Sequence, residues 1–225
     1  MKKLILIMFM MVSTVYANDI YITQSGATLD LDITQDGQNN TICSSTTSSS
    51  IIGATTNFDI RQVGNSNVIT FDVNGANYTG TWAITGNSNN IDFKCDSGGS
   101  NSSCGTATAN ITWTGSSQDI DLDIGETSAA GSATVNITGA SGSDSNVVAA
   151  TIDGTSAILT LSVNGDTNNY LIDIDGNGDI NGHTLIHNHT GGIADVDITQ
   201  SGINDQMINL TTSGDNHDID ISQTD

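Results

Sequence analysis

The chain has 225 residues, and its hydrophobic share of 36 % and charged share of 13 % are both low for a globular domain. Acidic residues number 25 against four Lys and Arg, so the formal net charge is −21 at pH 7. This excess of acid excludes nucleic acid as an expected partner and argues against an anionic membrane surface, because both contacts need clusters of Lys and Arg.

Residues 1–17 (MKKLILIMFMMVSTVYA) have the pattern of a secretory signal peptide of the bacterial type. Two lysines precede an apolar run, and Val15-Tyr16-Ala17 resembles a small-residue cleavage site. A membrane anchor is disfavoured, because a run of about ten residues is shorter than the roughly 20 that a bilayer span needs. No later segment is long and apolar enough to insert into a membrane. We therefore expect a secreted protein, extracellular or at the cell surface, with a mature chain of residues 18–225.

The strongest pattern in the mature chain is a repeat of eleven residues. Glycines recur at this interval, as in the series Gly64, Gly75 and Gly86. Alternating stretches such as Ile20-Tyr21-Ile22-Thr23-Gln24 precede most of them, which is typical of strands with one buried face. Gly and Asn tolerate the positive φ of a tight turn. One unit is therefore a strand plus a turn, and two units form a closed loop of about 22 residues.

We predict an all-β fold, a parallel β-solenoid of about eight such two-strand rungs. A single rung cannot bury its apolar face, whereas stacked rungs can, and they also pair one another's backbone groups. The absence of Pro agrees with this, since each Pro would remove a donor from the ladder. Longer intervals between glycines predict loop insertions near 43–50, 95–104, 126–133, 140–146 and 177–184.

The phase of the alternation predicts which side chains point into the solenoid. These inward residues include Ile20, Ile22, Leu31, Ile33, Phe58, Ile60, Ile69, Phe71, Val73, Trp82, Ile84, Ile91, Phe93, Ile111, Trp113, Val135, Ile137, Leu159, Leu161, Val163, Ile172, Ile174, Val196, Ile198, Ile208, Leu210, Ile219 and Ile221. Glutamines occupy the slot two residues before several glycines. We expect them to stack and bond to one another along the solenoid axis, or else to end strands at the surface.

Three cysteines leave one unpaired if a disulfide forms. Cys95 and Cys104 bracket a Gly/Ser/Asn loop, and an oxidising compartment would let them pair. Cys43 is then left over. Zinc is a poor interpretation, because the three cysteines are widely separated and have no histidine nearby.

Calcium is the one cofactor that the sequence leaves open. Asp173-x-Asp175-x-Asn177-Gly178-Asp179 resembles the start of an EF-hand-type loop, although Thr184 replaces the usual twelfth-position Glu and no flanking helix is expected. An ordinary Asp/Gly-rich turn is the alternative. Rows of outward acids would bind calcium loosely or simply keep the sheet soluble. His183, His187 and His189 fit strand histidines better than a metal site.

Three segments carry a shared motif most clearly, and two later ones repeat it. They are Gln24-x-Gly26, Gln35-x-Gly37-x-x-Asn40, Gln62-x-Gly64-x-x-Asn67, Gln200-x-Gly202 and Gln223. This pattern resembles the curlin repeat of curli-type amyloid fibre subunits over residues 19–42, 57–75 and 193–225. The resemblance implies an extracellular structural or adhesive fibre subunit. It also implies that the partner is a second copy and that these Gln, Gly and Asn residues set the register of self-assembly.

The two ends of the mature chain share one pattern, DIYITQSG and DIDISQTD. An uncapped terminal rung is an open sheet edge that pairs with another chain, and two matching ends would add head to tail into filaments. We therefore expect an exported protein that assembles into curli-like fibres. A nucleating protein or a surface ligand is a further candidate partner.

Two other functions remain as alternatives. A monomeric surface-binding solenoid of the adhesin or ice-binding type, with or without calcium, would need a flat and regular Thr array. The outward positions hold Asp, Arg and Ala as well as Thr. A solenoid enzyme would need a cleft with basic groups, and the mature chain offers only Arg61 and Lys94. No catalytic motif is present, so we expect no enzyme.

Overall fold

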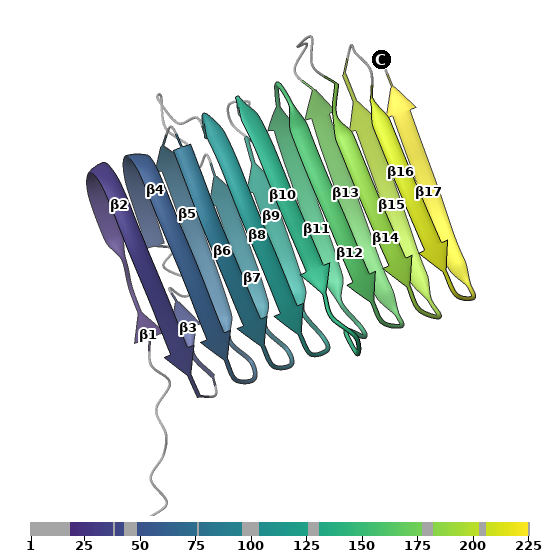
Figure 1. Cartoon of the computed structure of the whole chain (residues 1–225), viewed down its shortest axis with the longest axis horizontal. Coiled ribbons are helices and arrows are strands. Elements are labelled where there is room, and N and C mark those ends of the chain that lie inside the picture. Colours follow the sequence, from purple (N-terminus) through teal and green to yellow (C-terminus); the bar gives the residue numbers. More distant parts are fainter. Residues whose placement is uncertain are drawn as a thin grey trace, which may run out of the picture.

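The computed structural model describes residues 19–37, 39–42, 49–75, 77–95, 104–125, 131–176, 182–202 and 206–224. The expected signal peptide and Cys43 lie outside these residues. All the described elements are strands, and they stack in parallel into a β-solenoid as predicted (Figure 1). No helix long and apolar enough to cross a membrane occurs in the described ranges.

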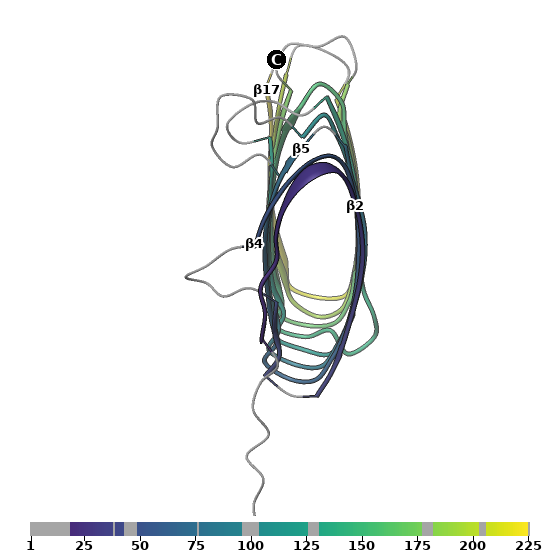
Figure 2. The same ribbon diagram turned by 90° about the vertical axis from the view of Figure 1, so that its left-hand side faces the viewer.

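The strands form two long faces, because nearly every strand pairs in parallel only with the strands two places before and after it. The even face consists of β2 (Thr23–Asp36), β4 (Ser49–Val63), β6 (Asn77–Thr85), β8 (Thr106–Thr114), β10 (Ser132–Gly139), β12 (Ala157–Asn164), β14 (Thr184–Thr190) and β16 (Met207–Ser213). The odd face consists of β1 (Asp19–Ile20), β3 (Thr41–Ile42), β5 (Val68–Gly75), β7 (Asn90–Cys95), β9 (Asp119–Ile124), β11 (Val147–Gly154), β13 (Asn168–Gly176), β15 (Ala194–Ser201) and β17 (His217–Thr224). The first residues of β2 and β4, Thr23–Gly26 and Ser49–Gly53, also lie on the odd face, so these two strands run across the corner. Viewed along the axis, the two faces enclose a narrow, elongated interior (Figure 2).

The turns of the solenoid are not uniform in length. Asn67 and Asn89 are stacked neighbours 22 residues apart, as expected, whereas Asn90 and Asp119 are stacked neighbours 29 residues apart. The predicted turn of about 22 residues is therefore present, and other turns are longer, as expected for insertions, so the number of rungs differs slightly from the predicted eight. The extra residues are absorbed in the corners, because parallel pairing keeps the strands in register.

A tight corner joins each even strand to the next odd strand. Its sequence is Gly-Asn-Ser-Asn at 64–67 and again at 86–89. Ser66 and Ser88 have φ near 60°. Each of these two corners ends in a buried asparagine, Asn67 or Asn89. The Asn40 N–H donates to Asn67 Oδ1 at 2.9 Å, and the Asn67 N–H donates to Asn89 Oδ1 at 3.0 Å. These amides satisfy backbone donors that the corner would otherwise bury unpaired.

A wide corner joins each odd strand to the next even strand. Three of the five expected insertions fall there, near 95–104, 126–133 and 177–184, and most of their residues lie outside the described ranges. The insertion near 43–50 instead interrupts the odd face, because Ile42 pairs with Ile69 and Ser49 pairs with Phe71. The fifth, 140–146, falls at a tight corner, where the Ser143 N–H donates to the Ala140 carbonyl oxygen at 3.1 Å. Longer segments thus gather at one edge of the molecule.

The core is a single column of inward side chains between the two faces. Every predicted inward residue points inward, and those away from the two end rungs are buried. Aromatic rings fill the N-terminal half, with Phe58 and Phe71 centroids 4.2 Å apart and Trp82 and Phe93 centroids 5.3 Å apart. Buried residues absent from the predicted set include Tyr78, Ile120, Leu122, Val148, Ile152 and Tyr170. They follow the same alternation in strands whose turns depart from the commonest spacing.

Candidate functional site

The C-terminal end of the solenoid is an open rung formed by β16 and β17. Ile219 and Ile221 point toward the interior but remain 37 % and 47 % exposed. Val196 and Ile198, their partners one rung below, are 0 % and 2 % exposed. The difference arises because no described strand covers β17 on its outer side. The end therefore exposes a strip of apolar core together with the unpaired backbone groups of an edge strand.

The N-terminal end has the same construction. Ile20, Ile22, Leu29 and Leu31 point inward and are only partly buried, although they pack against the core. Within the described residues, β1 pairs only with β3, and β2 pairs only with β4. A second open edge thus lies at the opposite end of the axis (Figure 1).

Two glutamine ladders lie at opposite ends and on opposite faces. On the even face, Gln62 Nε2 donates to Gln35 Oε1 at 3.0 Å, and both side chains are buried. On the odd face, Gln223 Nε2 donates to Gln200 Oε1 at 2.9 Å. In both pairs the later rung donates to the earlier one. The expected stacking of these glutamines along the axis is therefore present, with one polarity throughout.

One column of the odd face has glutamine at both ends. The register of successive strands is Gln24, Ile51, Val73, Cys95, Ile124, Ile152, Ile174, Gln200 and Gln223. Gln223 uses its Nε2 on Gln200, which leaves its Oε1 as the next acceptor on the open side. The Gln24 side chain lies outside the described part of the chain, whereas its backbone pairs in register with Ile51.

The glycines of the repeat play two different roles. Gly37, Gly64 and Gly202 have φ of 140°, 147° and 142°, which favours glycine at the end of a strand. Gly26 was expected in a turn of the same kind, and this is wrong. It lies within the continuous strand β2, opposite Gly53 of β4, where the chain curves from the odd to the even face (Figure 2).

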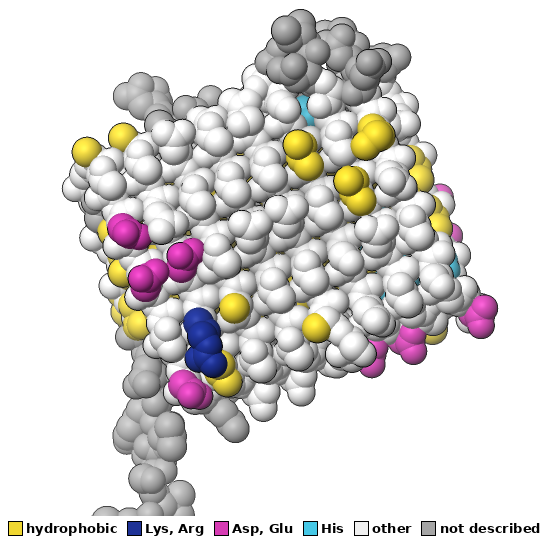
Figure 3. All heavy atoms as spheres, in the orientation of Figure 1, with side chains coloured by type: hydrophobic (Ala, Val, Ile, Leu, Met, Phe, Trp, Pro, Cys, Tyr) yellow, Lys and Arg dark blue, Asp and Glu magenta, His cyan; other side chains and the backbone are white. Residues whose placement is uncertain are grey.

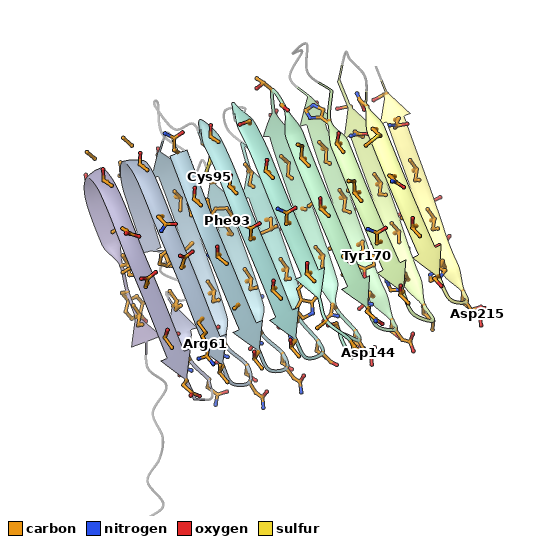
Figure 4. The ribbon with its side chains drawn as sticks, viewed as in Figure 1. Arg61, Phe93, Cys95, Asp144, Tyr170 and Asp215 are labelled. Atoms are coloured by element: carbon orange, nitrogen blue, oxygen red, sulfur yellow. A yellow bond between two sulfur atoms is a disulfide. The ribbon has the colours of Figure 1, made fainter. Side chains whose placement is uncertain are left out.

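A disulfide joins Cys95 and Cys104, whose Cα atoms are 5.6 Å apart. Both residues are buried at the wide corner between β7 and β8 (Figure 4). The bond closes the expected insertion at its base. It therefore holds the two strands in place whatever the length of the loop between them.

The calcium candidate is only half within the described residues. Asp173 and Asp175 are exposed on the odd face, and Asp175 Oδ1 accepts a hydrogen bond from Ser201 Oγ at 2.7 Å. Burial and the neighbouring Asp175 raise the pKa of Asp173. Asn177 and Asp179 lie outside the described residues. No group of three or more His, Cys, Asp or Glu side chains arranged for a metal ion occurs among those that are described.

The histidines form a buried group instead. His187 packs against Tyr170 with ring centroids 4.5 Å apart, and the Tyr170 hydroxyl hydrogen-bonds to His189 Nδ1 at 3.0 Å. His189 also lies 5.3 Å from the ring of His217. Burial, together with the neighbouring His189, lowers the pKa of His187 to about 4. His183 accepts the Ala157 N–H at 3.0 Å, and burial lowers the pKa values of His183 and His189. His183, His187 and His189 are therefore neutral at pH 7.

Acidic side chains are concentrated on the outside of the odd face. Asp92 stacks on Asp121, and Asp195 and Asp197 stack on Asp218 and Asp220. Burial and neighbouring carboxylates raise the pKa values of Asp92 and Asp121. Within this acidic surface, Lys94 Nζ forms an ion pair with Asp123 at 2.8 Å. The sequence-based prediction missed this concentration of charge on one face, because it treated the outward positions of both faces as one set.

No protein-family model matches this chain, and neither a curated protein nor a solved structure matches it. The two open rungs, with their glutamine ladders, are the feature from which a function can be argued.

Proposed function

We propose that this chain is an exported fibre subunit that assembles head to tail through its two open rungs. The observation that carries the proposal is the shared register of the end strands. The column that begins at Ile20 ends at Ile219, and the column that begins at Gln24 ends at Gln223. Adding a second copy in that register covers Ile219 and Ile221 with the half-buried Ile20 and Ile22.

The glutamine ladder supports the same polarity. Within the chain, each later glutamine donates to the earlier one. In the proposed junction, Gln24 of the added copy takes the next position in the column after Gln223, so the glutamine pair gains a third member. Buried amides are satisfied in this way without a change of interface type. A contact of this heterologous kind does not close on itself, so it produces filaments rather than dimers.

Charge opposes the same contact. Asp218 is the last member of an outward column that begins at Asp19, so stacking brings two carboxylates together at the junction. Like charges directly opposite one another across paired strands are destabilising, and salt screens them. We propose that added salt or a divalent cation such as calcium accelerates assembly.

The test uses residues 18–225, followed by thioflavin fluorescence, sedimentation and electron microscopy at low and high salt. We expect Ile219→Lys to abolish filament growth, because it places a charge in the apolar strip of the junction. The monomer should still fold, since Ile219 is already 37 % exposed. Val147→Lys is the matched control, because Val147 is 42 % exposed on the outside of the odd face, away from both ends.

Two results would contradict the proposal. One is a wild-type protein that stays monomeric at high concentration in salt and calcium. The other is Ile219→Lys protein that forms the same filaments as Val147→Lys protein.

A further inference from the structure

The outside of the even face is uncharged over most of its area. From β6 to β16, every outward side chain is Thr, Asn, Ser, Ala, Ile or Met, and Thr fills half of the positions. The face has charges only on β2 and β4, including Asp59 and Arg61. Figure 3 faces this side and shows uncharged atoms covering it, with the charged side chains gathered at one end and along the lower edge.

We infer that this face, called here the Thr/Asn array, binds the surface of ice. The array comprises the outward residues of β6, β8, β10, β12, β14 and β16. The inference does not depend on fibre assembly, because a single chain presents the whole array.

The array is a two-dimensional lattice with fixed repeats. Rungs are spaced by about 4.8 Å along the axis, and outward residues of one strand by about 6.6 Å. Threonines occupy the same register in up to three successive rungs, as in the row of Thr79, Thr108 and Thr134. The rung spacing is close to one repeat of water oxygens in hexagonal ice, and the spacing along a strand is somewhat shorter than the second repeat of the same plane. Water held by the hydroxyls of such rows therefore matches ice along the axis and approximately across it.

The side chains of the array are held in place rather than free. Thr is β-branched and has a stiff χ1, so a row of stacked threonines keeps its hydroxyls and methyl groups in line. Asn136 Nδ2 donates to Asn110 Oδ1 at 2.9 Å, which orders a second row across two rungs. Holding the surface rigid reduces the entropy lost when bound water becomes part of a lattice.

The chemistry of the face favours ice over other flat partners. An anionic or cationic mineral would need a charged face, which the chain has on the other side. A crystalline polysaccharide would be expected to stack on aromatic rings, and no aromatic residue occupies an outward position of the array. The exposed Ile158 and Met207 interrupt the Thr rows without adding charge.

The test measures thermal hysteresis and ice recrystallisation in solutions of residues 18–225 carrying Ile219→Lys, which keeps the chain monomeric under the proposed function. We expect this protein to stop ice growth below the melting point. The Thr112→Tyr/Thr138→Tyr double variant should lose most of that activity, because two stacked rings stand out from the centre of the array. Leu171→Tyr on the odd face, where Leu171 is 56 % exposed, is the matched control and should retain it.

Circular dichroism and melting temperatures confirm that each variant folds. The inference is overturned if the protein shows no hysteresis beyond the colligative value, or if Thr112→Tyr/Thr138→Tyr retains full activity. It is equally overturned if sedimentation finds a dimer that this variant abolishes, because the array is then covered by a second copy. Failure of filament growth in the previous experiment would leave these outcomes unaffected.

Discussion

The even and odd faces share one core and one strand spacing, yet their outer surfaces differ in kind. At neighbouring rungs, the even face stacks Asn110 and Asn136 as a hydrogen-bonded amide pair, while the odd face stacks Asp92 and Asp121 as a pair of carboxylates. The odd face adds further acids on β13, β15 and β17. A parallel solenoid permits this because each face is a separate stack with its own outward rows.

In this fold, the outward residues of one face can be charged while those of the other face stay neutral. Rows of acids on the odd face oppose contacts between the odd faces of two copies, because like charges repel. The neutral even face remains free for a partner that charge would repel. The two faces should therefore respond differently to acid, to packing changes and to salt.

The largest difference is expected in the response to acid. His187 on the inner side of β14 has its pKa lowered to about 4, so it stays neutral in the folded chain while the unfolded chain takes up a proton below about pH 6.5. Stability is therefore fully present above pH 6.5 and is lost as the pH falls toward 4, by about 3 kcal/mol at most. The raised pKa values of Asp92 and Asp121 have the opposite effect on stability. The folded chain takes up these protons more readily than the unfolded chain, so protonating the two carboxylates at low pH stabilises the fold.

The measurement is the denaturant midpoint of wild type and His187→Leu between pH 7.5 and pH 4, at about equal ionic strength. Leucine is the natural replacement, because Leu161 and Leu210 are the partners of His187 in the rungs on either side. We expect the variant to be more stable at pH 7, since both ring nitrogens of His187 lack partners, and to lose most of the acid sensitivity. His217→Gln is the control, because the His217 ring is only partly buried. Parallel pH profiles for wild type and His187→Leu would assign the acid response to other groups.

A second difference concerns the packing of the inward side chains on the even face. A Cβ added at Gly139 would lie 2.5 Å from the ring of Trp113 directly below it, whereas the corresponding odd-face rungs stack Ile124 on Ile152. Gly139→Ala should therefore destabilise the chain by about 1–3 kcal/mol through overpacking. Thr138→Ala, the neighbouring outward change, should stay within about 0.5 kcal/mol. Urea melts of both variants check this, and Trp113→Phe in the Gly139→Ala background should recover part of the loss. Equal stability of the two single variants would show that the indole can move aside.

Much of this fold follows from alternation and glycine spacing alone. The inward residues, the parallel stacking and the Gln35–Gln62 and Gln200–Gln223 ladders all arise from a strand period of two and a repeated corner. The wrong expectation at Gly26 has a physical reason. A glycine in a repeat serves either a positive φ or the close approach of two backbones, and its spacing is the same for both.

The division into two faces could not be read from spacing alone. Outward Asp, Arg and Thr residues alternate along the chain, and only the pairing of each strand with the second next sorts them into separate surfaces. One signal was available. The stretches that end at Gly125 and Gly176 hold several outward acids each, whereas those that end at Gly86 and Gly115 hold none. Assigning alternate half-turns to alternate faces would have separated the two.

The smallest effect on stability is expected when the stacked pair of one face is replaced by the stacked pair of the other. Asp92→Asn/Asp121→Asn converts the odd-face pair to the amide pair of the even face, and it should stabilise the chain by up to about 1 kcal/mol at low salt, because like charges across paired strands are unfavourable. Asn110→Asp/Asn136→Asp makes the reverse exchange and should cost a similar amount. Melting temperatures from about 10 mM to 500 mM salt provide the readout, since screening removes most of an exposed repulsion. The first variant should lose part of the wild-type salt response and the second should gain one. If both variants shift stability in the same direction, the side-chain amides rather than the charges determine it, and the two faces differ less than their composition indicates.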